Sequence, residues 1–267
     1  MRPGVVAATG LGAIAIGMAI RRFIKMQRLK VEELTMGTTV GANRLSDEEV
    51  EGAIFDCDGT LIDSMSAWLP SWQYACSQYR LQMTEAKFWG FAGVPLPDIV
   101  RSIYAEAHDG ERANDAFVEQ FLKCKKKFHA EAEAKAGSPP AIDCVINLVR
   151  GYIARGVPVA IASSGLRDIV ERHCAHAGVL ELFEGNVVVA AEVVKGKPAP
   201  DVFLAAAEMI GADPAKCRAY EDGESGLEAA WRAGMHVVDV RDMEGYPMND
   251  GLRGAMAKQR AARAWLV

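Results

Sequence analysis

The stretch Ala53-Ile54-Phe55-Asp56-Cys57-Asp58-Gly59-Thr60 decides the fold. A short apolar run ends abruptly in two aspartates and a glycine, which is typical of a buried parallel strand followed by a tight loop. Four later apolar runs end in a similar way, at residues 157–162, 186–190, 217–220 and 235–240. Continuous apolar strands of this kind indicate a parallel sheet that is covered on both faces.

Helical stretches separate the later strands, at residues 167–178, 200–210 and 225–233. This alternation predicts an α/β fold with a doubly wound, Rossmann-like parallel sheet. About ninety residues separate the first strand from the second, and they are rich in tryptophan, tyrosine and phenylalanine. We interpret residues 65–138 as an inserted helical cap domain, and residues 46–64 and 139–243 as the catalytic core.

The two ends of the chain differ from the middle. Val5 to Ile20 is an almost unbroken apolar run, and basic residues from Arg21 to Lys30 follow it before the first acidic residue. We interpret residues 1–45 as an anchor or targeting segment plus a linker at 36–43. The alternatives are a membrane helix, an organelle-targeting peptide and a dispensable extension; without such a role the protein is cytoplasmic. Residues 244–267 are predicted to form a tail helix that packs on the body.

Composition excludes several classes of protein. The chain has 267 residues, of which 50% are hydrophobic and 24% are charged, which is typical of a folded globular protein. Its net charge of −5 argues against nucleic acid as the main partner. Its six cysteines form no CxxC pair, which favours reduced thiols over a disulfide framework or a zinc site.

Polar side chains follow the predicted strands at the ends where ligands bind in such sheets. These residues are Asp56, Asp58, Ser163, Glu221 and Asp222. A cluster of carboxylates repels itself unless a hard cation lies within it, and Mg²⁺ with oxygen ligands is the natural candidate. Lys197 and Ser163 would add a cation and a hydroxyl to the same crevice. Together these groups indicate a site that holds a phosphoryl group during transfer.

The order and spacing of these residues resemble the four motifs of the haloacid dehalogenase superfamily. The motifs are Asp56-Cys57-Asp58-Gly59-Thr60, Ser163, Lys197-Pro198-Ala199-Pro200-Asp201 and Glu221-Asp222, and the resemblance covers residues 51–241. The helical insert is similar to the cap of the beta-phosphoglucomutase-like subgroup. Residues 190–207 and 217–241 look most like fructose-1-phosphate phosphatase-type members.

The resemblance implies a role for each motif. Asp56 would be the nucleophile that forms an aspartyl-phosphate, and Asp58 would be the general acid and base. The implied Mg²⁺ ligands are Asp56, the backbone carbonyl of Asp58, Asp222 and Glu221. The implied phosphate-binding groups are Ser163, the backbone N–H of Ser164, the loop at Gly59, and Lys197.

These roles predict a Mg²⁺-dependent phosphatase that acts on a small phosphorylated metabolite, with a sugar phosphate as the expected substrate. A beta-phosphoglucomutase-type isomerase is the first alternative, although Leu96 stands where the resemblance places a phosphate-gripping arginine. A non-catalytic, membrane-tethered binding protein is the second. We expect a monomer that contacts a membrane, if at all, through residues 5–20, and that binds no nucleic acid.

Two further patterns have simpler interpretations. His173 and His176 lie three residues apart on a predicted helix, and we interpret them as surface or packing residues rather than metal ligands. Lys123, Lys125, Lys126 and Lys127 form a basic run in the predicted cap, which we interpret as a solvated helix face, with attraction of an anionic substrate as the alternative.

Overall fold

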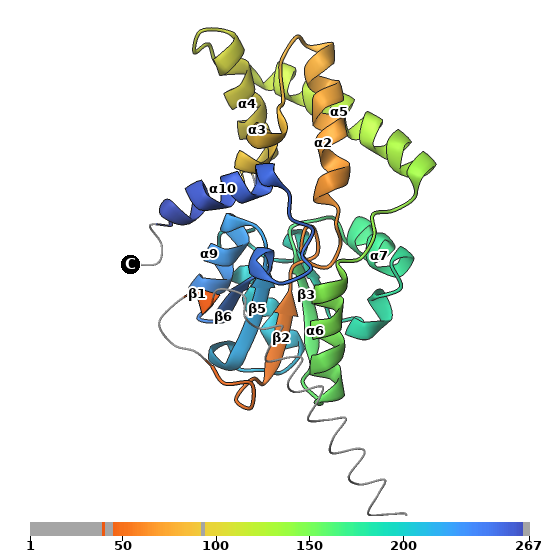
Figure 1. Cartoon of the computed structure of the whole chain (residues 1–267), viewed down its shortest axis with the longest axis vertical. Coiled ribbons are helices and arrows are strands. Elements are labelled where there is room, and N and C mark those ends of the chain that lie inside the picture. The colour runs from red at the N-terminus through yellow and green to blue at the C-terminus, as the bar shows by residue number, and fades with distance from the viewer. Residues whose placement is uncertain (1–38, 41–44, 92–93, 264–267) are drawn as a thin grey trace, which may run out of the picture.

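The computed structural model describes residues 39–40, 45–91 and 94–263, and it contains a six-stranded sheet in the order β1-β6-β5-β2-β3-β4 (Figure 1). The strands are β1 (Thr39–Val40), β2 (Gly52–Phe55), β3 (Val159–Ser163), β4 (Val187–Val189), β5 (Cys217–Glu221) and β6 (His236–Asp239). All neighbouring strands from β2 to β6 are parallel, and β1 runs antiparallel to β6. The predicted doubly wound α/β fold is therefore confirmed.

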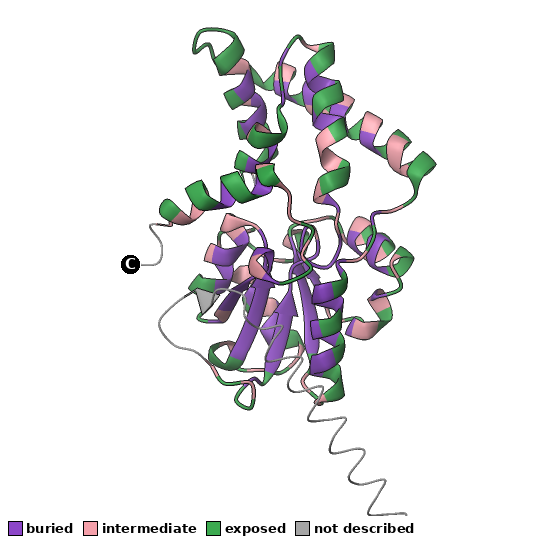
Figure 2. Ribbon diagram, in the orientation of Figure 1, coloured by how far each residue is buried: buried purple, intermediate pink, exposed green. Residues whose placement is uncertain are grey.

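Helices cover both faces of the sheet because every central strand is apolar on both sides. Phe55 packs in one hydrophobic cluster with α6 (Asp143–Ala154) and α7 (Arg167–His176). Its neighbour Ile54 packs in a second cluster with α8 (Asp201–Met209) and α9 (Glu224–Arg232). Figure 2 shows the strands β2, β3 and β5 as buried along their whole length and these helices as buried on one side only. Adjacent strand residues thus bury opposite faces of the sheet, as the pleat requires.

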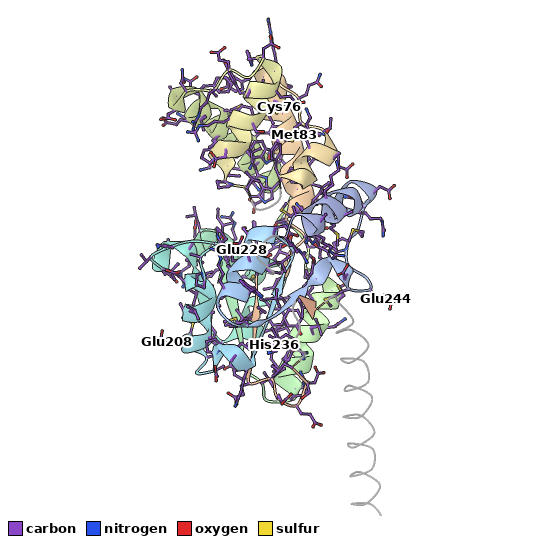
Figure 3. The ribbon with its side chains drawn as sticks, turned by 90° about the vertical axis from the view of Figure 1, so that its left-hand side faces the viewer. Cys76, Met83, Glu208, Glu228, His236 and Glu244 are labelled. Atoms are coloured by element: carbon purple, nitrogen blue, oxygen red, sulfur yellow. The ribbon has the colours of Figure 1, made fainter. Side chains whose placement is uncertain are left out.

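A separate layer of helices lies between β2 and α6 in the chain. It consists of α2 (Met65–Gln78), α3 (Glu85–Gly90), α4 (Leu96–Ala107) and α5 (Asp115–Ala136). Buried side chains such as Trp72, Phe88 and Phe121 give this layer a hydrophobic core of its own. In Figure 3, Cys76 and Met83 lie in this layer, whereas Glu228 and His236 lie in the layer of the sheet. We call α2 to α5 the cap.

The C-terminal helix α10 (Asp250–Ala261) packs against the cap. Its first turn is capped by Asn249, whose side-chain oxygen accepts a hydrogen bond of 2.8 Å from the Leu252 N–H. Leu252, Ala255 and Met256 are buried in the same hydrophobic cluster as the cap core. The sequence predicted a helix that packs on the body, and the structure shows that its apolar face lies on the cap at α3.

The segment predicted as a linker at 36–43 contains a strand. Thr39 pairs with Val238 and Val40 pairs with Val237, so β1 adds an antiparallel edge to the sheet. These two β-branched residues favour an extended strand, which the neighbouring glycines and threonines obscured in the sequence. Short 3₁₀ turns connect other elements, at Leu180–Phe183, Ala190–Glu192, Pro214–Lys216 and Val240–Asp242.

The predicted anchor or targeting run at residues 5–20 lies outside the described residues. Within the part of the chain that the structure describes, none of the helices combines the length and the apolar character that a bilayer span requires.

Candidate active site

The loop after β2 is tight enough to present two aspartates at one place. The carbonyl of Cys57 accepts hydrogen bonds from the N–H groups of Thr60, Leu61 and Ile62 at 3.3, 3.0 and 3.0 Å. Gly59 has φ +85°, and a Cβ atom at this position would lie 2.2 Å from Asp222 Oδ2. Glycine is therefore required both by the backbone conformation and by the close approach of Asp222.

Three carboxylates converge at the carboxyl ends of β2 and β5. Phe55 and Tyr220 are register partners on these parallel strands, so Asp56 and Glu221 leave the sheet side by side. One carboxylate oxygen from each of Asp56, Glu221 and Asp222 lies within 4.8 Å of the other two. All three residues are buried. The structure thus brings together three of the carboxylates that the sequence placed in one crevice.

Lys197 compensates part of this negative charge. Its Nζ donates to Asp56 Oδ1 at 2.5 Å, to Glu221 Oε1 at 2.9 Å and to the Ala162 carbonyl at 3.0 Å. The lysine therefore contacts the ends of β2, β3 and β5. Burial disfavours its charge, but Asp56 and Glu221 together raise the pKa of Lys197 above its usual value. The two carboxylates thus favour the charged form of Lys197.

One lysine does not balance three buried carboxylates. Burial, opposed by Lys197 and reinforced by Glu221, raises the pKa of Asp56 to about 7. Burial and the charges of Glu221 and Asp56 raise the pKa of Asp222 well above its usual value. Both groups would gain from a further cation, and oxygen donors alone suit a hard divalent ion such as Mg²⁺. The acidic cluster therefore fits a metal ion.

Asp58 and Ser163 approach each other across the crevice. A Cβ atom at Gly165 would lie 3.3 Å from Ser163 Oγ and 3.4 Å from Asp58 Oδ2, so both side chains border the same small space. Asp58 Oδ1 is buried and has no hydrogen-bond partner among the described residues. Ser163 Oγ accepts a hydrogen bond of 3.0 Å from the Gly165 N–H. A carboxylate with one unpaired oxygen and the other oxygen close to a hydroxyl is suited to a polar ligand.

One implied phosphate contact, the loop at Gly59, stays a prediction, and the structure shows which group its amide contacts. The Gly59 N–H donates to the Ile62 carbonyl at 2.8 Å, so this amide is already engaged within the loop. Ser164 lies at the exposed end of β3, where its N–H stays a predicted phosphate contact.

The cap contributes a lysine, Lys125, that is buried although the sequence predicted it to be solvated. Lys125, interpreted as part of a solvated face, is 2% exposed, and its Nζ lies 3.8 Å from the ring centroid of Trp68 and 5.1 Å from that of Trp72. Among the described residues, no carboxylate lies within ion-pair distance of this nitrogen. Burial and the charge of Lys126 lower the pKa of Lys125 to about 7. The spacing of four residues from Phe121 to Lys125 to His129 was the signal that these residues share a buried face.

Lys125 borders a pocket of about 220 Å³ in the cap. The other walls are apolar and come from α2, α3, α4 and the chain between them: Met65, Trp68, Trp72, Met83, Phe88, Phe91, Val94, Leu96 and Ile99. Leu96 is 39% exposed at this wall. A single cation in an apolar pocket is typical of a site that orients a ligand through one polar contact.

The two histidines are not brought together with other metal ligands. His173 is buried and its Nε2 lies 2.9 Å from Glu133 Oε1 on α5, whereas His176 is exposed. The acidic cluster at Asp56 is the one group of metal-type ligands found among the described residues. The interpretation of His173 as a packing residue agrees with this contact.

Comparison with known proteins assigns the family. A profile of the haloacid dehalogenase-like hydrolases matches residues 50–234, which is most of the chain, and the chain belongs to this family. It is therefore an enzyme with the fold that the sequence predicted.

The matches to individual relatives span most of each relative's length. The chain is 31% identical to fructose-1-phosphate phosphatase YqaB of Escherichia coli (strain K12) over 195 residues, which are 73% of this chain and 98% of the relative. It is 24% identical to beta-phosphoglucomutase of Bacillus subtilis (strain 168) over 199 residues, which are 74% of this chain and 86% of the relative. A solved hydrolase of the family from Deinococcus radiodurans R1, with bound phosphate and sodium, is 26% identical with a TM-score of 0.59 and covers 82% of this chain and 97% of that structure.

Proposed function

We propose that this enzyme is a Mg²⁺-dependent phosphatase that hydrolyses the monoester of a small phosphorylated metabolite, with a sugar phosphate as the expected substrate. The observation that carries the proposal is the contact of Lys197 with both Asp56 and Glu221, beside a second aspartate, Asp58, that has an unpaired oxygen. The relative named as a fructose-1-phosphate phosphatase supports the choice of substrate class.

The chemistry begins at Asp56. Its carboxylate attacks the phosphorus atom, the bond from phosphorus to the ester oxygen breaks, and an aspartyl-phosphate forms. Asp58 donates a proton to the leaving oxygen and later takes one from the water that hydrolyses the acyl phosphate. Its unpaired Oδ1 and its closeness to Ser163 support this role.

The remaining groups bind and neutralise the phosphoryl group. Ser163 and the backbone N–H of Ser164 would hold its oxygens, and Lys197 would keep the charge of Asp56 and of the phosphoryl group balanced. Asp56, Asp222 and Glu221, with the Asp58 carbonyl, would hold Mg²⁺. When bound, the ion would supply charge neutralisation at the phosphoryl oxygens.

The cap pocket would receive the part of the substrate that is not transferred. Lys125 is the one charged group among its lining residues, and it is suited to a hydroxyl or an anionic group of the substrate. A mutase must hold a second phosphate at a distance from the first, and Leu96 leaves this part of the pocket apolar. Hydrolysis is therefore favoured over isomerisation.

A substrate panel tests the proposal. The purified full-length protein is incubated with phosphorylated sugars, polyols and nucleotides, with Mg²⁺ or with EDTA, and free phosphate is measured. We expect Mg²⁺-dependent release that Asp56→Asn abolishes. Formation of glucose 6-phosphate from beta-glucose 1-phosphate without phosphate release would favour the mutase, and turnover that does not depend on Asp56 would contradict the proposed mechanism.

A further inference from the structure

We propose that Tyr246 is a positioning residue for the catalytic loop and that the C-terminal helix α10 holds it there; this inference rests on the proposed phosphatase function. Tyr246 Oη donates a hydrogen bond of 2.6 Å to the carbonyl oxygen of Gly59. Gly59 lies directly after Asp58, the proposed acid and base, and before Thr60, whose hydroxyl contacts Asp222 at 3.1 Å. One hydroxyl from the C-terminal segment thus reaches the centre of the loop.

The contact fixes one of the two peptide groups that lie between Asp58 and Thr60. The N–H of Gly59 is held by Ile62, and the carbonyl of Gly59 is held by Tyr246, so both sides of this glycine are restrained. Without the hydroxyl, the flexible backbone of Gly59 could rotate, and Asp58 and Thr60 would move relative to each other. Tyr246 therefore acts on the geometry of Asp58 without touching the substrate.

Tyr246 is itself held from both layers of the molecule. Its ring packs against the hydrophobic cluster of the sheet with α6 and also against the hydrophobic cluster of the cap. Helix α10 begins four residues later and buries Leu252 and Met256 in that cap cluster. Gln259 Nε2 adds a hydrogen bond of 3.3 Å to the Trp89 carbonyl at the end of α3.

The other end of α10 is anchored to the sheet by charge. Arg260 and Arg263 donate to Asp239 Oδ2 at 3.1 and 2.8 Å, and Arg263 also donates to Glu224. Burial disfavours ionisation of Asp239, yet hydrogen bonds from Arg241 and Arg263 hold its pKa below the usual range. Figure 1 shows α10 lying crosswise between α3 of the cap and α9, a helix that covers the sheet.

This connection is additional to the two linkers by which the cap joins β2 and α6. It also lies beyond residues 50–234, which match the family profile. The position of Tyr246, and through it the loop at Gly59, is therefore coupled to the contact between α10 and the cap. The segment from Tyr246 to Arg263 therefore positions the catalytic loop in addition to covering apolar surface of the cap.

The first test removes only the hydroxyl. We expect Tyr246→Phe to lower kcat about tenfold, which corresponds to one well-placed hydrogen bond, with KM nearly unchanged. Hydrogen exchange of amides in residues 57–62 should accelerate about tenfold. Tyr152→Phe is the matched control, because it also removes a buried tyrosine hydroxyl. This hydroxyl lies 2.6 Å from Tyr220 Oη and does not contact the loop at Gly59. Tyr152→Phe should leave kcat and the exchange of residues 57–62 unchanged.

The second test shifts α10 with a single methyl group. A Cβ atom at Gly251 would lie 2.9 Å from Trp89 Cδ1 and 3.1 Å from Glu85 Cγ, whereas a Cβ at Gly254 would have nothing within 4 Å. Both changes replace a glycine of α10 by alanine, which has the higher helix propensity. Gly251→Ala should lower kcat several-fold and accelerate exchange in the loop, and Gly254→Ala should do neither.

Unchanged kcat and unchanged loop exchange in Tyr246→Phe would overturn the positioning role. Equal effects of Gly251→Ala and Gly254→Ala would overturn the coupling through α10. If the wild-type enzyme shows no phosphatase turnover, the proposed function fails, but the exchange comparison still decides whether Tyr246 restrains the loop.

Discussion

Lys197 Nζ lies 2.5 Å from Asp56 Oδ1, although the two residues are 141 positions apart in the chain. This pair joins the end of β2 to the segment that precedes α8, and both side chains are almost fully buried. The charge of a buried carboxylate beside one lysine and two further acids can be neutralised further by a proton or by a metal ion. Its protonation and its metal affinity must therefore depend on each other.

Stabilisation by Mg²⁺ should increase with pH. The pKa of Asp56 is about 7 in the folded protein against an ordinary value of 3.8, so between these values the unfolded chain releases its proton and the folded protein retains it. Stability of the metal-free protein thus falls as pH rises from about 4 to about 7. Mg²⁺ replaces the protons, so it should raise Tm by about 5–10 °C at pH 8 when present a hundredfold above its Kd. The rise at pH 5.5 should be much smaller.

Differential scanning fluorimetry with Mg²⁺ or EDTA at the two pH values measures this difference. Asp222→Asn is the control, since it removes one proposed ligand and should reduce the effect of Mg²⁺ at pH 8. Equal Tm shifts at both pH values would show that the carboxylates are not the metal site.

Gly226→Ala should inactivate the enzyme by displacing Glu221. A Cβ atom at Gly226 would lie only 1.6 Å from Glu221 Oε1, so the carboxylate must move away from Lys197. We expect kcat to fall at least about a hundredfold, because Glu221 is displaced and Lys197 loses its contact with Glu221. Gly90→Ala serves as the comparison, because nothing lies within 4 Å of its added methyl group. Retained activity in Gly226→Ala would mean that Glu221 has no part in the site.

Lys125→Met should impair binding more than turnover. Methionine keeps the length and the apolar contacts with Trp68 but removes the one charge of the cap pocket. We expect KM for the best substrate of the panel to rise about tenfold to a hundredfold, with kcat changed little. Because the pKa of Lys125 is about 7, the KM of the wild-type enzyme should also rise between pH 6.5 and 8.5, and this rise should vanish in the variant. An unchanged KM in Lys125→Met would exclude contact with the substrate.

The N-terminal segment should affect location rather than catalysis when it is cut at the right residue. Deletion of residues 1–38 keeps β1, and we expect kcat and KM to stay nearly unchanged while the protein leaves the membrane or organelle fraction. Deletion of residues 1–45 also removes the Leu45 carbonyl, which accepts a hydrogen bond of 2.8 Å from Arg218, so it should lower Tm in addition. Cell fractionation and thermal unfolding of both forms measure this. A freely cytosolic full-length protein would contradict the predicted anchor or targeting role.

The sequence predicted the sheet and most of the candidate site because a buried strand can be recognised from a short run of apolar residues. Asp56 and Glu221 follow such strands directly, and parallel register then brings them together without further information. Lys197 was found through a motif, since nothing local shows that its side chain crosses to Asp56.

The remaining features depend on tertiary packing. Lys125 lies in a run of lysines, and only its spacing from Phe121 and His129 hinted that it is buried. Nothing in the sequence around Tyr246 indicates its contact with Gly59, which joins residues 187 positions apart. The engagement of the Gly59 N–H within its own loop was likewise invisible, because it follows from a backbone conformation rather than from a residue type.

The most direct test of the account is to trap the covalent intermediate. The enzyme is mixed with a ³²P-labelled substrate and Mg²⁺, quenched in acid within milliseconds, and the labelled peptide is identified by mass spectrometry. We predict a phosphoryl group on Asp56 that is lost at high pH, as an acyl phosphate is, and that is absent in Asp56→Asn. A phosphoryl group on another residue, or rapid turnover by Asp56→Asn, would contradict the assignment of Asp56 as the nucleophile.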